Sequence, residues 1–306
     1  MQTIIGAGGA VGTELAKSLL SYTSDIRLVS RNPKKVNPSD QLFPADVTNR
    51  EQIFKAVEGS EIVYVTVGFD YNIKVWRSTW PPLMRNVIDA CKQFKAKLVF
   101  FDNIYLYDPK SVGHLTENNP INPSSNKGKV RAEIANMLTD EIKAGNITAL
   151  IARAPDFYGP FNTKSVLVET VYKPFSTGKP ANWFGSIDKI HTFIYTPDAG
   201  KATAILGNTP DAYNQVWHLP CDNRKLTGKQ FIEMFAKEMN KPVKIQVLPK
   251  WMCSIIGLFV PIMKEFPEMY YQYENDYYFD CSKFQEKFNF KVMPYEEGVK
   301  MTVQNQ

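Results

Sequence analysis

The segment PSSNKGKVRAE, residues 123–133, carries hydroxyl and ammonium groups close together in the sequence, and such groups can form hydrogen bonds or take part in proton transfer. Lys129 opens a run with an apolar helical face, and Ser125 stands four residues before it, so a helix would place both side chains on one face. An ammonium group can donate hydrogen bonds, whereas a serine hydroxyl is too weak an acid to exchange a proton unless a base activates it. Ser125 also stands where serine commonly caps a helix. Ser125 is therefore expected to cap a helix rather than to transfer a proton.

A glycine-rich turn lies at the start of the sequence. GAGGAVG places Gly6, Gly9 and Gly12 between a strand-like segment and a helix-like one. Such glycines allow a tight turn and a close approach of a pyrophosphate, which the N–H groups of the helix amino terminus then bind. We also expect Gly68, which ends the apolar run EIVYVTVG, to contact the cofactor. The pattern predicts a dinucleotide-binding site.

The end of the second strand-like run bears on which dinucleotide is bound. An acidic residue there would bind the ribose hydroxyls of NAD, but the sequence has Ser30 and Arg31. A guanidinium group suits a 2′-phosphate, so NADP is favoured, with NAD as the alternative. Asp46, followed by Val47, ends the third run and is placed to contact the adenine amino group, although a plain loop aspartate is an equal alternative.

The elements that would position these residues alternate regularly. Near-continuous apolar runs, typical of strands buried on both faces, alternate with helical patterns over residues 2–150. We expect helices to start near Arg50 and at Pro81-Pro82. Together they predict an α/β fold with a Rossmann-like, doubly wound parallel sheet. The strand-like runs are residues 2–6, 25–30, 41–46, 61–68, 96–101 and 147–153.

The alternation of strand-like and helix-like segments ends after ARAPDFYGP. The tail from residue 227 has mainly helical patterns and is rich in aromatic residues. We expect residues 1–160 to form an NAD(P)-binding Rossmann domain to which residues 188–221 contribute. Residues 161–187 and 222–306 would then form a smaller, mainly helical substrate or lid domain, because ligand crevices form outside the carboxyl ends of such strands.

Composition narrows the class of protein. The 306 residues are 44% hydrophobic and 22% charged, as in ordinary globular proteins. The net charge of +5 comes from scattered lysines and arginines, which suits an anionic cofactor but gives no clustered face for nucleic acid. The four cysteines lack metal-ligand spacing, so we expect no metal. The apolar stretch 251–263 is too short to span a bilayer, and it suggests a buried helix or a homo-oligomer contact in a cytoplasmic protein.

Several motifs together resemble one family. The glycine turn, Asp46-Val47, the run from Lys129 to Glu133, and the segments RAPDFYGP and TFIYTPDAGKA are similar to those of extended or atypical short-chain dehydrogenases/reductases. The likeness is to the NAD-dependent epimerase/dehydratase group and runs nearly end to end.

The resemblance implies two catalytic positions, Asn103 and Lys129. Family members use a Tyr-x-x-x-Lys pair and an upstream serine, and their lysine binds the nicotinamide ribose, so the resemblance implies that Lys129 contacts the ribose. Here Ser125 takes the tyrosine position and Asn103 the serine position, while counting from Lys127 instead would put Pro123 at the tyrosine position. An amide can orient a carbonyl but cannot donate the proton of the missing phenol.

Two further departures concern the substrate. His191 stands where the family has an arginine that grips the diphosphate of nucleotide sugars, and Asp156 where it often has asparagine. Mostly neutral imidazole makes no bidentate phosphate contact, so a nucleotide sugar is disfavoured.

Three functional hypotheses follow. The first is an NADP-dependent oxidoreductase that reduces a small carbonyl or a conjugated double bond, because the cofactor performs the hard step. The second is a catalytically inactive redox sensor that binds NADP. The third is a sugar epimerase or dehydratase, which needs a proton-transfer residue in place of the missing tyrosine.

Overall fold

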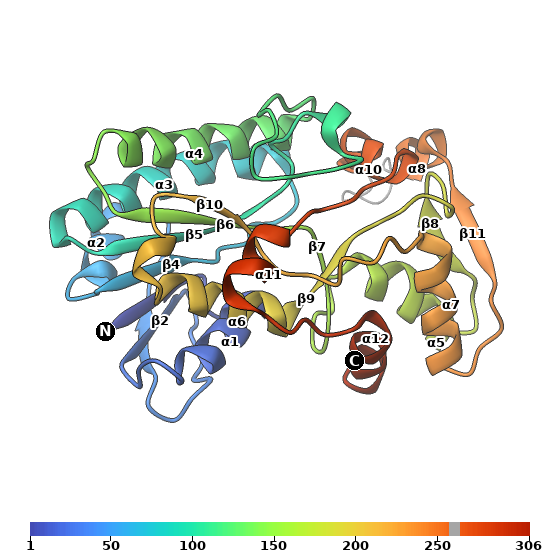
Figure 1. The fold of residues 1–306 in the computed structure, drawn as a ribbon, viewed down its shortest axis with the longest axis horizontal. Coiled ribbons are helices and arrows are strands. Elements are labelled where there is room, and N and C mark those ends of the chain that lie inside the picture. The colour runs from blue at the N-terminus through green and yellow to red at the C-terminus, as the bar shows by residue number, and fades with distance from the viewer. Residues whose placement is uncertain (257–263) are drawn as a thin grey trace. The chain divides into compact units, whose positions relative to one another are not determined.

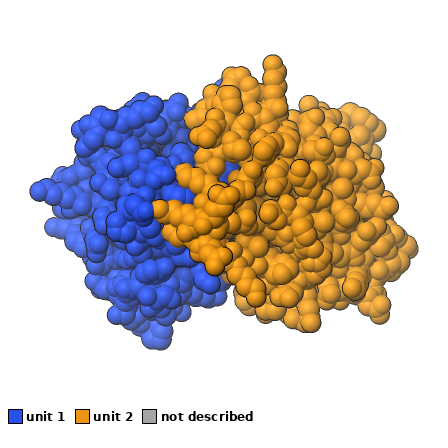
Figure 2. All heavy atoms as spheres, in the orientation of Figure 1, with its two compact units in different colours: residues 1–106, 127–154, 199–219 blue, residues 107–126, 155–198, 220–306 orange. Residues whose placement is uncertain are grey.

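The computed structural model describes residues 1–256 and 264–306 and divides them into two compact units (Figure 2). Unit 1 comprises residues 1–106, 127–154 and 199–219. Unit 2 comprises the described residues of 107–126, 155–198 and 220–306. The predicted domain limits differ from these units at residues 107–126, 155–160, 188–198 and 220–221, and they stay a prediction.

Unit 1 is built on a seven-stranded sheet in which every paired strand runs parallel to its neighbour. The strand order is β10-β6-β5-β4-β1-β2-β3, the order of a doubly wound Rossmann sheet, as predicted. The strands are β1 (Gln2–Ile5), β2 (Ile26–Ser30), β3 (Gln41–Pro44), β4 (Ile62–Val65), β5 (Lys97–Asn103), β6 (Ala149–Ala154) and β10 (Val216–His218).

Helices cover both faces of this sheet (Figure 1). On one face, α2, α3 and α4 bury their apolar sides against β4, β5 and β6 in one hydrophobic core. On the other face lie α1 and α6, which approach so closely that a Cβ on Gly200 would come within 2.7 Å of the Glu14 side chain. Burial on both faces explains the near-continuous apolar runs of the central strands β1, β4 and β6. The helices are α1 (Ala10–Leu19), α2 (Arg50–Val57), α3 (Ile73–Phe94), α4 (Asn126–Lys143) and α6 (Thr196–Gly207).

Helix α3 starts eight residues before the predicted Pro81-Pro82 start, and both prolines lie inside it. The side chain of Asn72 accepts hydrogen bonds from the backbone nitrogens of Lys74 and Val75, which caps the true start. Trp76 and Trp80, one turn apart, are buried. Burying these two indoles in the first turns offsets the backbone hydrogen bonds that the prolines cannot make.

Unit 2 has two small parallel sheets, β7 with β9 and β8 with β11, around an aromatic core. Its strands are β7 (Asp156–Tyr158), β8 (Ala181–Phe184), β9 (Phe193–Tyr195) and β11 (Ile245–Leu248). Its α-helices are α5 (Lys173–Ser176), α7 (Gly228–Glu238), α8 (Lys250–Ile256), α10 (Tyr271–Glu274), α11 (Ser282–Phe288) and α12 (Tyr295–Gln304). Short helical turns occupy Pro109–Ser111, Val168–Tyr172 and Pro267–Met269 in unit 2, and Pro210–Ala212 in unit 1.

The C-terminal part is mainly helical, as predicted. The apolar stretch 251–263 includes most of α8, but its remainder, 257–263, lies outside the described residues. Within residues 1–256 and 264–306, no helix has the length and apolar character needed to cross a membrane.

Candidate functional site

The turn between β1 and α1 has the geometry of a phosphate-binding loop. Gly6 has φ +98°, and a Cβ there would lie 2.6 Å from the backbone nitrogen of Val67, which lies just after the neighbouring strand β4. Gly12 would place a Cβ 3.0 Å from both the Gly6 carbonyl oxygen and the Thr66 hydroxyl. Gly8, which the glycine pattern did not single out, has φ +101°. Positive φ and backbone contact at these distances both favour glycine.

The first turn of α1 is suited to an anion. Gly9 occupies the N-cap position, no side chain caps the helix, and the first turn has no acidic residue. The amino-terminal N–H groups of a helix lack partners within the helix and carry the positive end of its dipole. Residues of this chain therefore fit a dinucleotide pyrophosphate at the carboxyl end of β1.

Exposed charges follow β2 and β3. Arg31 is exposed directly after β2, and it is close enough to Asp46 to help lower the pKa of that carboxyl. The larger causes of this lowered pKa are hydrogen bonds from the Thr48 backbone and side chain, at 2.9 and 2.7 Å. Asp46 thus shapes its own turn, while Val47 packs partly against the sheet core. Gly68 is exposed after β4, and a Cβ there would meet nothing within 4 Å.

Asn103 ends β5, at the same edge of the sheet. Its side-chain oxygen accepts a hydrogen bond from the Tyr105 backbone nitrogen at 3.1 Å, so the amide nitrogen is the group that it can present to a ligand oxygen. Its own backbone nitrogen donates to Asp102 at 2.8 Å.

The first turn of α4 presents Lys127, not Lys129, to the interior. Lys127 is fully buried, and its ammonium nitrogen lies 4.4 Å from the centre of the Tyr71 ring. Lys129 is exposed, which does not support its expected contact with a bound ribose. Ser125, directly before α4, is buried. The buried lysine of this helix is therefore Lys127. If it is the counterpart of the family's lysine, the tyrosine position four residues before it is Pro123.

The Tyr71 ring beside Lys127 belongs to a group of packed aromatic rings. Tyr71, Trp76, Trp80 and Tyr105 form a cluster, here called the aromatic cluster, with ring centres 5.9–6.3 Å apart from one ring to the next. The Arg131 guanidinium lies over the Trp80 ring at 4.4 Å. Cations over aromatic faces are stabilised when desolvated. The aromatic cluster therefore forms an apolar surface near the carboxyl ends of β4 and β5, and two of its rings contact the cations of Lys127 and Arg131.

Arg131 also belongs to a buried ion triad. Its Nε donates to Asp102 at 2.8 Å, and the Arg153 Nε donates to the other oxygen of the same carboxylate at 3.2 Å. All three side chains are at most 4% exposed. Buried charges need such pairing, so the triad fixes α4 to the ends of β5 and β6.

In unit 2, His191 and Asp156 form a pair. The His191 Nε2 lies 2.8 Å from an Asp156 oxygen, and the imidazole stacks on Tyr273 with ring centres 4.7 Å apart. Tyr158, one possible substitute phenol, is fully buried, and burial raises its pKa well above the ordinary value. A hydroxyl so enclosed is a core group and a poor proton donor to a ligand.

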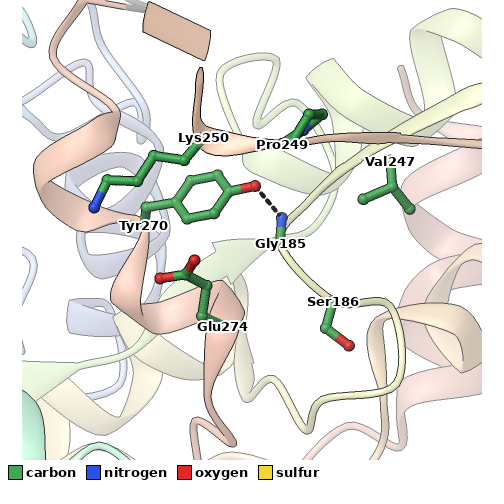
Figure 3. Close-up of a pocket in the computed structure, with 7 residues that line it drawn as sticks. All are labelled: Gly185, Ser186, Val247, Pro249, Lys250, Tyr270 and Glu274. Atoms are coloured by element: carbon green, nitrogen blue, oxygen red, sulfur yellow. Dashed lines mark hydrogen bonds between the residues drawn. The ribbon is translucent and has the colours of Figure 1, made fainter. Parts of the chain in front are cut away.

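Unit 2 also contains a small cavity of about 340 Å³ (Figure 3). Figure 3 shows the Tyr270 ring reaching across to the Gly185 backbone nitrogen, with Lys250 and Glu274 on either side of it. The Tyr270 hydroxyl accepts from Gly185 at 2.8 Å and donates to Leu248 at 2.6 Å, so it braces the loop. The remaining lining residues are Ser186, Val247 and Pro249. Among the described residues, no group of histidine, cysteine, aspartate and glutamate could hold a metal.

The fold and the glycine turn are typical of dinucleotide-binding α/β proteins, and comparison with known proteins gives the family of this chain. A family model described as NAD dependent epimerase/dehydratase family matches residues 3–218. The chain belongs to this family, and the sheet order and helical C-terminal part agree with it. None of the curated proteins matches the sequence.

Solved structures of similar fold include sugar-nucleotide enzymes. UDP-glucuronic acid 4-epimerase from Bacillus cereus, in complex with UDP-glucuronic acid and NAD, has 18% identity and TM-score 0.81, covering 100% of this chain and 98% of that one. UDP-glucose 4-epimerase from Thermus thermophilus, in complex with NAD, has 17% identity and TM-score 0.78 with the same coverage. dTDP-glucose 4,6-dehydratase from Streptomyces venezuelae, with NAD and TYD bound, has 12% identity and TM-score 0.80, covering 99% and 96%.

Proposed function

We propose that this protein binds a nicotinamide dinucleotide in unit 1 and uses it to oxidise or reduce a carbon that bears a sugar hydroxyl, as an epimerase or dehydratase. The observation that carries the proposal is the turn after β1, where Gly6 and Gly12 leave no room for a side chain and α1 has no capping side chain. Family membership and the NAD named for its structural neighbours support the same cofactor class. When bound, the nicotinamide would accept and return the hydride.

The ribose contact belongs, in this proposal, to Lys127. Its buried ammonium group stands in the first turn of α4, at the carboxyl edge of β5, and it can donate charge-assisted hydrogen bonds to ribose hydroxyls. Lys129 would remain in solvent. The Asn103 amide nitrogen, at the end of β5, would donate to the substrate oxygen and orient it.

Tyr71 is the phenol that we assign to proton transfer. Removing hydride from a carbinol carbon requires loss of the proton on its oxygen, and neither Ser125 nor Pro123 can accept it. Tyr71 is partly buried in the loop after β4, and the Lys127 cation beside it would stabilise its phenolate by Coulomb attraction. The tyrosine and the lysine, which the family carries on one helix, would then come from the loop after β4 and from α4.

A turnover assay tests this function. Purified protein with NAD⁺ or NADP⁺ would be incubated with UDP-glucose, dTDP-glucose and unactivated sugars, and the products would be followed by NMR and by absorbance of the reduced cofactor. We expect a C4 epimer or a keto-sugar from at least one of them, and Tyr71→Phe should slow its formation at least about 100-fold, as general acid–base residues do. Equal turnover by Tyr71→Phe would remove Tyr71 from the mechanism.

A small carbonyl compound is the second candidate substrate. The aromatic cluster offers an apolar wall, and His191, which is paired with Asp156, stands where the family has a phosphate-binding arginine. Oxidation of NADPH by simple aldehydes or enones, with no reaction of any sugar, would favour this reductase over the epimerase or dehydratase.

We further propose NADP as the preferred cofactor. Arg31 follows β2 in an exposed position where it can bind a 2′-phosphate, and Ser30 can add a hydroxyl donor. NADPH should bind at least about tenfold more tightly than NADH, and Arg31→Asp should reverse that order. Replacement of Lys35, whose ammonium donates to the Pro38 carbonyl, should change it little and is the matched control. Equal affinities in the parent protein would contradict the assignment.

A further inference from the structure

Two cysteines lie in contact inside unit 2. The sulfur atoms of Cys221 and Cys281 are 3.6 Å apart, and the two residues are 2% and 1% exposed. Both are free thiols. Cys221 follows β10, whereas Cys281 directly precedes α11, so the contact joins segments separated by 60 residues.

Hydrogen bonds hold the two segments in this arrangement. The Cys221 backbone nitrogen donates to the Cys281 sulfur at 3.3 Å, and the Cys281 thiol lies 3.5 Å from the Cys221 carbonyl oxygen. Gln285, from α11, donates to the same carbonyl at 3.0 Å. The sulfurs thus face each other because their backbones are paired, and only a small shift separates them from bonding distance. A disulfide needs about 2.05 Å, so the sulfurs must approach by roughly 1.5 Å.

We propose that Cys221 and Cys281 are a reversible disulfide pair, oxidised by a peroxide. The Cys281 thiolate attacks one peroxide oxygen and breaks the O–O bond, which gives a sulfenic acid and, after proton transfer, water. The Cys221 sulfur then attacks the sulfenic sulfur and displaces its hydroxyl as a second water. Two thiols are oxidised to one disulfide and one hydrogen peroxide is reduced to two water molecules, so atoms and electrons balance.

The surroundings make this reaction slow. The hydrogen bond with Cys281 and burial raise the pKa of Cys221 well above its ordinary value, so this thiol is rarely ionised while the pair is enclosed. Peroxide reaches the pair only when the 221–224 and 279–281 segments open. The rate of oxidation should therefore follow local opening and rise in urea concentrations below the unfolding transition.

The disulfide would tie together several segments of unit 2. Next to Cys221, Asp222 accepts a hydrogen bond from the backbone nitrogen of Tyr295, at the start of α12. Next to Cys281, Asp280 pairs with His114 at 2.8 Å. Closing a loop of this length restricts the unfolded chain, and the oxidised protein should melt roughly 5–10 °C above the reduced one.

Peptide mapping of the full-length protein tests the proposal. Reduced, desalted protein would be treated with hydrogen peroxide, blocked with N-ethylmaleimide, digested without reductant and analysed by mass spectrometry. We expect one linked peptide pair, containing Cys221 and Cys281, with the mass loss of two hydrogens and reversal by phosphine. Cys281→Ser should abolish both the link and the melting shift. Cys91→Ala, which removes an equally buried thiol from unit 1, is the matched control and should retain both.

The mapping of the unaltered chain decides the matter even where a serine variant fails to fold. Peptides in which both cysteines remain thiols after prolonged peroxide treatment in mild urea would overturn the proposal. So would separate sulfinic or sulfonic acids at the two positions, a link to Cys91 or Cys253, or a link between two chains.

Discussion

The ammonium nitrogen of Lys127 lies 4.4 Å from the centre of the Tyr71 ring. Tyr71 comes from the loop after β4, and Lys127 comes from the first turn of α4. A lysine is almost never fully buried unless its charge is compensated, and Lys127 is fully buried. The ring supplies part of that compensation. The pair therefore fixes a positive charge at the carboxyl edge of the sheet.

Replacing this lysine should weaken cofactor binding. Lys127→Met removes the charge with little change in volume, and loss of a charge-assisted hydrogen bond of about 1.5–3 kcal/mol predicts a roughly ten- to hundredfold weaker affinity for NADH and NADPH, measured by fluorescence titration. Lys129→Met is the matched control and should change the affinity less than about twofold, because Lys129 is exposed. An equal loss in both variants would argue against the Lys127 assignment.

Two glycines should separate folding from cofactor binding. In Gly12→Ala the new Cβ would lie 3.0 Å from the Gly6 carbonyl oxygen, so we expect lost cofactor binding together with a lower free energy of unfolding in urea. In Gly68→Ala the Cβ meets nothing within 4 Å, so stability should not change. If the cofactor passes beside Gly68, its affinity should fall at least about tenfold. Unchanged affinity in Gly68→Ala would remove Gly68 from the cofactor site.

The buried triad should be sensitive to loss of the Asp102 carboxylate. Asp102→Asn removes the carboxylate that Arg131 and Arg153 share, and breaking a buried ion pair lowers the free energy of unfolding by about 3–5 kcal/mol. Asp89→Asn, which breaks a surface pair with Arg50, should change it by less than about 1 kcal/mol. Urea unfolding followed by circular dichroism measures both, and equal effects would show that the triad is solvated.

An ion pair at α12 gives unit 2 a pH-dependent contribution to stability. The hydrogen bond from Arg224 lowers the pKa of Glu296 below its ordinary value of 4.5. Its contribution is therefore present above that value and is lost as the pH falls through the lower, folded-state pKa. Both side chains are about half exposed, so Glu296→Gln should lower the free energy of unfolding at pH 7 by no more than about 0.5 kcal/mol. In this variant the free energy of unfolding should also decrease less on acidification than it does in the parent protein.

Arg224→Met should have the larger effect. It also removes the guanidinium that donates hydrogen bonds to Asp222. Asp222 is 8% exposed and accepts a hydrogen bond from the backbone nitrogen of Tyr295. We therefore expect a loss of about 1–2 kcal/mol in the free energy of unfolding. Chemical unfolding of both variants between pH 3 and pH 7 provides the measurement. A smaller loss in Arg224→Met than in Glu296→Gln would show that Asp222 does not depend on Arg224.

The central strands of unit 1 could be predicted because burial on both faces gives β1, β4 and β6 a nearly unbroken apolar run, whereas the edge strand β3 is largely exposed. Helix α3 could not be placed as well, since Pro81-Pro82 resembles a helix start and conceals the true cap at Asn72. The cysteine pair was also beyond prediction, because 60 residues separate Cys221 from Cys281 and only the folded unit 2 brings them into contact.

The position of the buried lysine could have been found in the sequence. The buried side of α4 includes Lys127, Val130, Ile134 and Leu138, which recur at three- and four-residue steps. Lys129 falls on the opposite, exposed side. Lys127 lies three residues before Val130, on the same side of the helix, so the apolar pattern of α4 predicts Lys127 as the buried lysine. The spacing of the family motif pointed to Lys129 instead. The contact of Lys127 with Tyr71 required the structure, because the two residues come from separate elements.

The sheet of unit 1 is completed late during synthesis. Strand β10 pairs with β6, with Val216 beside Ile151, yet residues 155–215 must be made between them. Until then β6 pairs with β5 alone and its other edge is open, and open strand edges promote wrong pairing and aggregation. Ribosome-bound chains that end before residue 216 should therefore depend on chaperones more than chains released at full length do.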